Sequence, residues 1–255
     1  PWSELDLLDE FHLSISSRKR HKDLEREVLE MADVTLTVSE TWVEDLKRLG
    51  ANRIEQITNG YDADDFELKP KINDKFIIGH YGLLNHIRNP KNLWKSLDEL
   101  CAENFDFDNK LEIHLSGNID GEVLAEIEAY PQLKAKVKQL GYLSHAQVLE
   151  QYNEADLLLL LLFNSKSGVG NYPGKIFEYF AAQKPILAFG PEGSDTQKLI
   201  AKTKTGKYFS YDEIELKNDI LTFFMNKKNF AFESMEGFSR KKLTHDLANL
   251  LNTLS

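Results

Sequence analysis

Lys175 and Glu178 lie three residues apart at the start of a predicted helix, directly after the glycine-rich stretch "SGVGNYPGK" (residues 167–175). At that spacing both side chains lie on one face of the first helical turn. A lysine there suits a phosphate, and a carboxylate suits the paired hydroxyls of a ribose or another sugar. The alternative is a purely structural role, in which the same two residues form a helical ion pair worth about 0.2–0.5 kcal/mol.

A second glycine-containing loop, "GLLNHIRNPKN" (residues 82–92), offers a similar arrangement. Gly82 lets the backbone approach a ligand closely, and the helix that follows presents free N–H groups and a positive dipole end. Arg88 and Lys91 lie at that helix start, where they would grip a diphosphate; as the alternative, both are solvent-facing charges. The sequence contains no GxGxxG fingerprint and no Walker P-loop, which argues against a standard NAD-binding domain or ATPase.

Further candidates for ligand binding are polar or glycine residues that follow other predicted strands. Asn118 would bond a sugar or simply mark a turn, and Tyr142 would lie against a base or be half-buried for packing. His80 and His114 fall on strands and are expected to be core or sheet-face residues. No metal site or Ser-His-Asp set is predicted. The full set of additional binding candidates comprises Gly117, Asn118, Gly141, Tyr142, Gly170, Asn171 and Gly174.

Strands that alternate with helices of about ten residues position these loops. The pattern indicates an α/β fold with a parallel sheet covered on both faces, and the strand "DLLLLLLF" (156–163), all-apolar over 157–163, belongs at its centre. In such sheets ligands bind beyond the carboxyl ends of the strands. The predicted strands of this series span 75–82, 110–117, 137–143, 156–163, 185–190 and 206–210, with helices at 89–103, 121–130, 144–155, 174–183 and 195–203 and a mostly helical remainder.

A shorter series of elements precedes these. It comprises helices at 23–33 and 39–50, the second with Ser39 as its expected cap, and strands at 34–39 and 53–60. The polar, aperiodic stretch 61–74 with Pro70 is predicted to be a linker. Ser144 is the expected cap of the helix at 144–155.

Composition narrows the class of protein. The 255 residues carry a formal net charge of −10 with a pI near 5.3, which argues against a general nucleic-acid binder. Basic clusters at 17–22 and 239–243 are expected to be solvated helix faces, with an anionic membrane surface as the alternative. The single cysteine, Cys101, excludes an intrachain disulfide and is expected to be a small core residue. No apolar run is long enough to cross a bilayer, so a cytoplasmic location is the default expectation.

The order of motifs resembles the family 4 GT-B glycosyltransferases, of the bacterial surface-polysaccharide type. "ADVTLTVSETWVEDLKRLG" and "ITNGYDADDF" are similar to the end of their N-terminal lobe, and "GHYGLLNHIRNPKNLWKSL", "LSGN", "VKQLGYLSHAQVLEQYNEADLLLLL", "PGKIFEYFAAQKPILA" and "FSRKKLTHDLANLL" follow in the family's order. The resemblance implies residues 1–68 as the end of the N-terminal (acceptor) lobe, 69–238 as a Rossmann-like donor-binding domain, and 239–255 as a helix that packs back toward the N-terminal lobe.

The resemblance also implies roles for residues. Glu178 corresponds to the second glutamate of an E-x7-E motif, which commonly binds the donor ribose, and Gly170 stands where the first glutamate belongs. Leu83 stands where many relatives have an arginine, so Arg88 is expected to take over the phosphate, with Lys175 sharing the charge. Arg88, Lys175 and Glu178 are thus the expected catalytic group.

The implied activity is metal-independent, retaining transfer of a sugar from a UDP-, GDP- or ADP-sugar to a glycan or lipid-linked acceptor. No cofactor beyond the donor and no nucleic-acid partner is expected, and peripheral contact with the inner membrane is possible for such enzymes. The opening "PWSELDLL", without an initiator Met, suggests a fragment that contains mainly the donor-binding half, with little or no activity of its own. The alternatives are a GT-B nucleotide-sugar epimerase or hydrolase, a non-catalytic nucleotide-binding domain and, more remotely, a flavodoxin-like phosphoacceptor domain.

Overall fold

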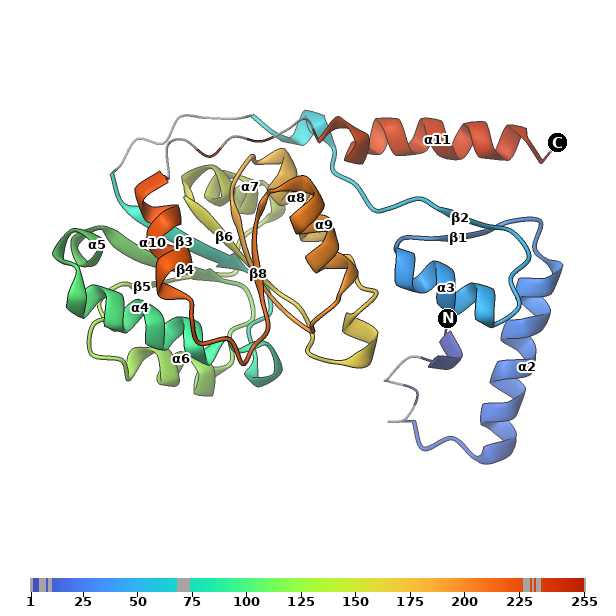
Figure 1. The fold of residues 1–255 in the computed structure, drawn as a ribbon, viewed down its shortest axis with the longest axis horizontal. Helices are drawn as coiled ribbons and strands as arrows, with labels where there is room; N and C mark the ends of the chain where they lie inside the picture. Colours follow the sequence, from blue (N-terminus) through green and yellow to red (C-terminus); the bar gives the residue numbers. More distant parts are fainter. Residues whose placement is uncertain are drawn as a thin grey trace.

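The protein is described here by a computed structural model in which two unequal parts are connected by two crossings of the chain (Figure 1). The larger part is a parallel sheet between two layers of helices, and the smaller part contains α2, α3 and a pair of short strands. The residues that the structure describes are 2–4, 8, 11–67, 74–226, 230, 232 and 235–254.

The larger sheet has six strands in the order β5-β4-β3-β6-β7-β8, and every neighbouring pair is parallel. This confirms the predicted α/β fold class. The chain starts at β3 and runs outward to β5, then returns to the centre at β6 and runs outward the other way to β8. The strands are β3 (Phe76–Tyr81), β4 (Leu111–Ser116), β5 (Val137–Gly141), β6 (Leu157–Leu161), β7 (Ile186–Phe189) and β8 (Gly206–Phe209).

The leucine run forms strand β6 and lies between β3 and β7, as predicted. Side chains alternate between the two faces of a strand, and each face here has its own hydrophobic core. Leu157 and Leu159 belong to one core, whereas Leu158 and Leu160 belong to the other. A strand that is buried on both faces has no polar side to present, which explains why the run is apolar throughout.

Seven helices of the larger part cover these two faces (Figure 1). Buried residues of α4, α5, α6 and α10 join the core that contains Leu157, and those of α7, α8 and α9 join the core that contains Leu158. The predicted cap Ser144 begins α7 with a full capping box. The helices are α4 (Lys91–Glu103), α5 (Phe105–Lys110), α6 (Gly121–Glu128), α7 (His145–Glu154), α8 (Gly174–Ala181), α9 (Asp195–Thr203) and α10 (Lys217–Asn226).

The smaller part has little core of its own. Leu29, Leu46 and Ala51 form its cluster of buried apolar residues, and its two strands pair in parallel over three residues each. Helix α2 is the longest of the described helices, and α3 is one of the shorter ones. Helix α2 begins earlier than predicted because Ser14 caps it. The elements are α2 (Ile15–Met31), β1 (Thr35–Thr37), α3 (Glu40–Arg48) and β2 (Ile54–Gln56).

The two crossings between the parts are hydrogen-bonded to each other. The Tyr61 N–H donates to the Phe238 carbonyl at 3.1 Å, and the Arg240 N–H donates to the Tyr61 carbonyl at 2.8 Å. Gly60 is required there, since a Cβ on it would lie 2.4 Å from the Phe238 oxygen. Part of the predicted linker, residues 68–73, falls outside the described residues.

Helix α11 (Arg240–Asn252) follows the second crossing and lies on the side of the smaller part (Figure 1). At its end, the Thr253 hydroxyl accepts a hydrogen bond from Arg53 at 3.4 Å. The short 3-10 helices are η1 (Trp2–Glu4), η2 (Ala63–Asp65), η3 (His86–Arg88), η4 (Lys166–Gly168) and η5 (Glu236–Phe238).

Candidate functional site

The strand order reverses its direction between β3 and β6. The chain leaves β3 toward one edge of the sheet and leaves β6 toward the other, so the loops after these two strands diverge at their carboxyl ends. Ligands of open α/β sheets bind at such a point of reversal. The loop after β3 contains Arg88, and the loop after β6 contains the predicted glycine-rich segment that leads into Lys175 and Glu178. Topology therefore brings the two candidate loops to one place.

Glycines at the ends of neighbouring strands are packed against one another in this region. The Gly82 N–H donates to the Ser116 carbonyl at 2.7 Å, and the Gly117 N–H donates to the Gly141 carbonyl at 3.0 Å. Gly117 has a φ of +104°, and a Cβ on it would lie 2.6 Å from the Gly82 oxygen. Larger residues would separate the loops, so the glycines give a ligand close access to the backbone.

Arg88 lies at the end of η3, and its guanidinium stacks on the ring of Phe163, 3.6 Å from the ring centre. This contact joins the loop after β3 to the loop after β6. Burial lowers the pKa of Arg88, with Tyr211 opposing the shift. Among the described residues, the buried Nε of Arg88 and the buried Oδ1 of Asn85 in the same loop have no hydrogen-bond partner. Unsatisfied buried polar atoms are rare, so two in one loop are consistent with a functional role for this loop.

Lys175 reaches the same place from α8. Its ammonium donates to the Tyr81 carbonyl, and its Nζ occupies the position that a Cβ on Gly82 would take. Burial is the main cause that lowers the pKa of Lys175; nearby Glu178 opposes this shift and Arg88 adds to it. An ammonium has three N–H donors, so two remain for a ligand. The alternative of a simple ion pair with Glu178 is not what the structure shows, because Lys175 bonds to the β3 backbone instead.

Glu178, one turn further along α8, accepts a hydrogen bond from the Tyr152 hydroxyl at 2.9 Å. Tyr152 is buried, and its ring makes edge contacts with Tyr81 and Tyr179. Burial raises the pKa of Tyr152, so its hydroxyl stays a donor. The phenol fixes one carboxylate oxygen of Glu178 and leaves the other as an acceptor for hydroxyl groups.

Gly170, in the loop after β6, contacts the smaller part of the molecule. Its carbonyl accepts a hydrogen bond from the Ser39 hydroxyl at 2.6 Å, and a Cβ on it would lie 2.5 Å from the indole of Trp42. Ser39 is the N-cap residue of α3, as predicted, but its side chain makes no capping hydrogen bond. The buried carboxylate of Asp195 takes that role by accepting from the Thr41 N–H at 2.7 Å.

The other predicted residues are spread around the loops. Lys91 is exposed and pairs with Glu126 of α6 at 3.5 Å, which agrees with the alternative that it is a solvent-facing charge. The Asn118 backbone carbonyl accepts from the Leu84 N–H at 3.0 Å, and the Asn171 carbonyl accepts from Thr196 at 2.7 Å, so both backbones hold loops in place. Tyr142 is 92% exposed, which rules out the half-buried alternative. Gly174 is the first residue of α8, with open space around its Cα.

Sequence reasoning missed the residues that connect distant segments. Asp195, Trp42 and Phe163 all contribute contacts at or near these loops, and no local pattern marked them. The one available signal concerned Asp195: it is the first residue of α9 and follows a strand, a turn and the cap of that helix. Cys101 is buried as predicted, and burial raises its pKa to about 12.

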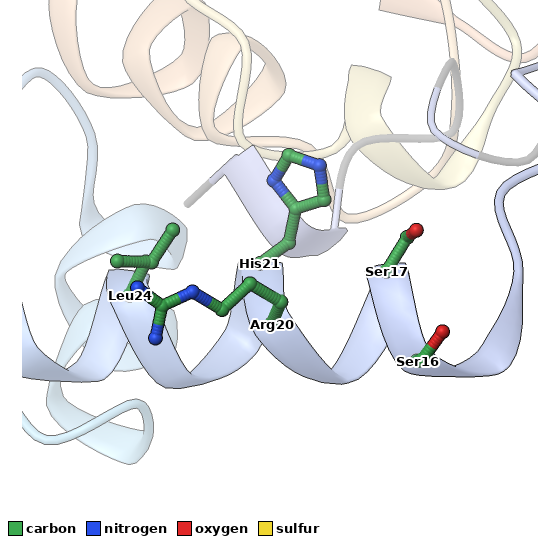
Figure 2. A pocket seen from close by; sticks show the side chains of 5 residues that line it. All are labelled: Ser16, Ser17, Arg20, His21 and Leu24. Carbon is green, nitrogen blue, oxygen red and sulfur yellow. The ribbon is translucent and has the colours of Figure 1, made fainter.

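A separate hollow of about 300 Å³ lies on α2 (Figure 2). Its described lining residues all come from that one helix, so it is a shallow surface feature, unlike the region between β3 and β6. They are Ser16, Ser17, Arg20, His21 and Leu24.

Solved structures share this architecture. HepE from Anabaena, in complex with UDP, superposes with a TM-score of 0.72 at 16% identity, over 97% of this chain and 70% of that one. Sucrose-phosphate synthase from Thermosynechococcus elongatus gives a TM-score of 0.70 at 16% identity over 99% and 66%. WaaG, a glycosyltransferase involved in lipopolysaccharide biosynthesis, gives 0.60 at 13% over 90% and 67%. A scan against protein-family models and a search of curated proteins give no match.

The doubly wound parallel sheet defines a Rossmann-like α/β protein. Together with these similarities, it shows the GT-B fold of glycosyltransferases. The chain spans about two thirds of the synthase. In the part of the chain that the structure describes, no helix combines the length and the apolar character needed to cross a membrane.

Proposed function

We propose that the chain binds the diphosphate of a nucleotide-sugar at the strand reversal between β3 and β6, as the donor-binding half of a retaining glycosyltransferase. One observation carries the proposal: Arg88 and Lys175 converge on the strand reversal from two different loops, and burial lowers the pKa of both. Cations in a poorly hydrated site lose the stabilisation that water gives to their charge. A diphosphate between them would compensate for this loss with its negative charge.

Each group has a task in that proposal. The two free N–H donors of Lys175 and the guanidinium of Arg88 bind the diphosphate oxygens, helped by backbone N–H groups near Gly82. As the bond to the sugar breaks, negative charge grows on the leaving diphosphate, and fixed cations stabilise it. Glu178, oriented by Tyr152, accepts hydrogen bonds from ribose hydroxyls. The cations perform the role that a metal has in other enzymes, so no metal is required.

The acceptor, the donor base and the part of the enzyme that this chain contains are further parts of the proposal. The acceptor is a glycan or a lipid-linked glycan, as expected for the family 4 surface-polysaccharide enzymes that the sequence resembles. The UDP in the HepE complex favours a uridine donor for a first test. This chain, which covers 70% of HepE, is proposed to contain the donor half rather than a complete transferase.

A second candidate, nucleotide binding without transfer, is favoured by the packing of Gly170. The space beside its Cα, where the resemblance expects an acidic side chain, is filled by Trp42. A site without that acid would bind the nucleotide and lose a contact to the donor sugar.

The test is a thermal-shift panel of UDP, GDP, ADP and CMP, followed by calorimetry with the best ligand. A ligand present at about a thousand times its Kd stabilises the folded state by about 4 kcal/mol. Arg88→Ala and Lys175→Ala should each weaken binding by about ten- to hundredfold, the equivalent of a charge-assisted hydrogen bond. EDTA should leave binding unchanged.

Lys95→Ala is the matched control, because it removes an exposed cation from α4 that pairs with Glu99 at 3.9 Å. Equal binding by wild type, Arg88→Ala and Lys175→Ala would overturn the site. Transfer is separated from binding alone by incubating the full-length protein with donor and a glycan acceptor, and measuring sugar incorporation. Donor that is bound but never consumed would favour the second candidate.

A further inference from the structure

His80 occupies a socket made of two carbonyl oxygens. It lies on the central strand β3, is 4% exposed, and has its Nδ1 3.1 Å from the Leu159 oxygen on β6. Its Nε2 lies 3.2 Å from the Leu83 oxygen, in the loop that begins at Gly82. The ring therefore connects the neighbouring strand to the loop that holds the candidate diphosphate site.

A neutral imidazole cannot donate a hydrogen bond to both of these carbonyl oxygens. It has one N–H donor and one lone pair, so one of the two carbonyls must face a lone pair. An imidazolium has two donors and would bond to both carbonyls. The Leu159 oxygen also accepts from the Tyr179 hydroxyl at 3.3 Å, so it is the Leu83 oxygen that depends most on the ring.

The surroundings nevertheless hold the ring neutral in the free protein. Burial first, and then the charges of Lys175 on α8 and Arg88 on η3, lower the pKa of His80 to about 4. The other titratable groups near it are uncharged phenols or already engaged: Tyr81 and Tyr179 have raised pKa values, and Glu178 bonds to Tyr152. On the adjacent strand β4, His114 pairs with Glu112. The two cations are thus the charges that oppose protonation.

We propose that His80 is a positioning residue that takes up a proton from solvent when a diphosphate binds between Arg88 and Lys175, and that the imidazolium then donates to the Leu159 and Leu83 carbonyls together. This rests on the proposed function. The negative charge of the diphosphate offsets the two cations and removes their effect on the ring. The second hydrogen bond fixes Leu83, and with it the loop after Gly82, in the ligand-binding conformation.

The sign of the pH dependence follows. The bound protein has the higher pKa at His80 and so holds more protons, and affinity must rise as pH falls. The effect is confined to the interval between a free pKa of about 4 and the raised pKa of the complex. Within that interval Kd falls by up to about tenfold for each pH unit, the limit for one linked proton.

Calorimetry tests this directly. The probes are UDP-glucose, GDP-glucose and ADP-glucose, whose diphosphate diesters keep a constant charge between pH 5 and 7, so that protons taken up belong to the protein. Titrations in two buffers of different ionisation enthalpy, at one pH between 5 and 6, give the number of protons taken up. We expect a net uptake for wild type, and a Kd that tightens toward acid pH.

His80→Gln keeps one amide donor but cannot take up a proton, so its uptake and its pH slope should both vanish. His114→Gln removes a buried histidine from the adjacent strand and should keep both. His80→Asn serves as a second variant if the glutamine variant does not fold. Wild-type binding without proton uptake, or uptake that persists in His80→Gln, would overturn this inference alone. If none of the three probes binds, the proposed function fails with it.

Discussion

The two parts of the molecule are stabilised in different ways. The larger part contains a six-stranded sheet buried on both faces by two extensive cores. In its described residues, the smaller part has a cluster of three buried apolar residues, two three-residue strands, and large apolar side chains such as Ile15 and Met31 that remain exposed. Because stability scales with buried apolar area, the larger part is held by its own core, whereas the smaller part depends on contacts with its neighbour.

Three contacts of this kind lie at the beginning of α3. Ser39 bonds to Gly170, Asp195 caps α3 through the Thr41 N–H, and Trp42 packs against Gly170. They attach the beginning of α3 to the loop after β6 and to the beginning of α9. The comparison teaches that the loop next to the candidate diphosphate site has a second task, since it also anchors the smaller part.

The largest effect is expected from the core of the larger part. Leu157→Ala removes a fully buried side chain from the central strand and should lower the free energy of unfolding by about 2–5 kcal/mol. Urea denaturation followed by circular dichroism measures it. Leu46→Ala, in the three-residue cluster, should cost less. Equal costs for the two would contradict the contrast between the parts.

The next effect is expected at the contact between the parts. Gly170→Ala places a methyl group 2.5 Å from the Trp42 indole and should destabilise the contact by about 1–3 kcal/mol. Hydrogen exchange measured peptide by peptide should show faster exchange in α3, with β3 to β8 unchanged.

Two further variants sharpen that result. Trp42→Ala combined with Gly170→Ala should relieve the clash and restore part of the protection. Gly121→Ala is the control, since its Cβ would meet nothing within 4 Å. Slow exchange of α3 in Gly170→Ala would show that the indole is not fixed there.

A smaller effect is expected from Asp195→Ala. It removes the carboxylate that accepts from the Thr41 N–H, and the loss of a helix cap costs about 0.5–2 kcal/mol. Exchange should increase at the first turn of α3 and little elsewhere. Asp246→Ala removes a partly exposed carboxylate that pairs with Lys242 on α11, and should leave α3 unchanged. If both variants behave alike, Asp195 does not anchor the smaller part.

The smallest effect is expected from Arg26→Ala on α2. Arg26 pairs with Glu30 at 2.6 Å, but both side chains are largely solvent-exposed. Exposed ion pairs contribute little to stability, so the midpoint of urea denaturation should not move measurably. The variant and wild type should also respond to salt in the same way. A clear loss of stability would mean that α2 contributes more than its few buried residues suggest.

The sequence was sufficient for the pattern of elements in the larger part and for the positions of the candidate loops, whereas ligand binding by these loops stays a prediction. Hydrophobic runs with glycine at their ends predicted the strands, and the position of Lys175 and Arg88 after two of them predicted their convergence. Helix α5 was missed, because Asn104 both ends α4 and caps α5, and the polar sequence of α5 offers little periodicity.

Contacts between distant residues could not be predicted from spacing. Ser39 and Gly170 are separated by 131 residues, and Thr41 and Asp195 by 154. Ser39 occupies the expected cap position, but its hydroxyl bonds to Gly170 in another part of the chain instead of to α3. The same holds for His80, whose two carbonyl partners are defined only after β3 and β6 are adjacent.

The paired crossings at Tyr61 and Ser239 have a mechanical consequence (Figure 1). Hydrogen bonds in both directions join the two segments there, so neither segment shifts along the other without breaking them. The smaller part is thus attached to the larger part both at these crossings and at the loop that faces Trp42. A movement that keeps the crossings intact and separates Trp42 from Gly170 is a rotation of the smaller part about the crossings.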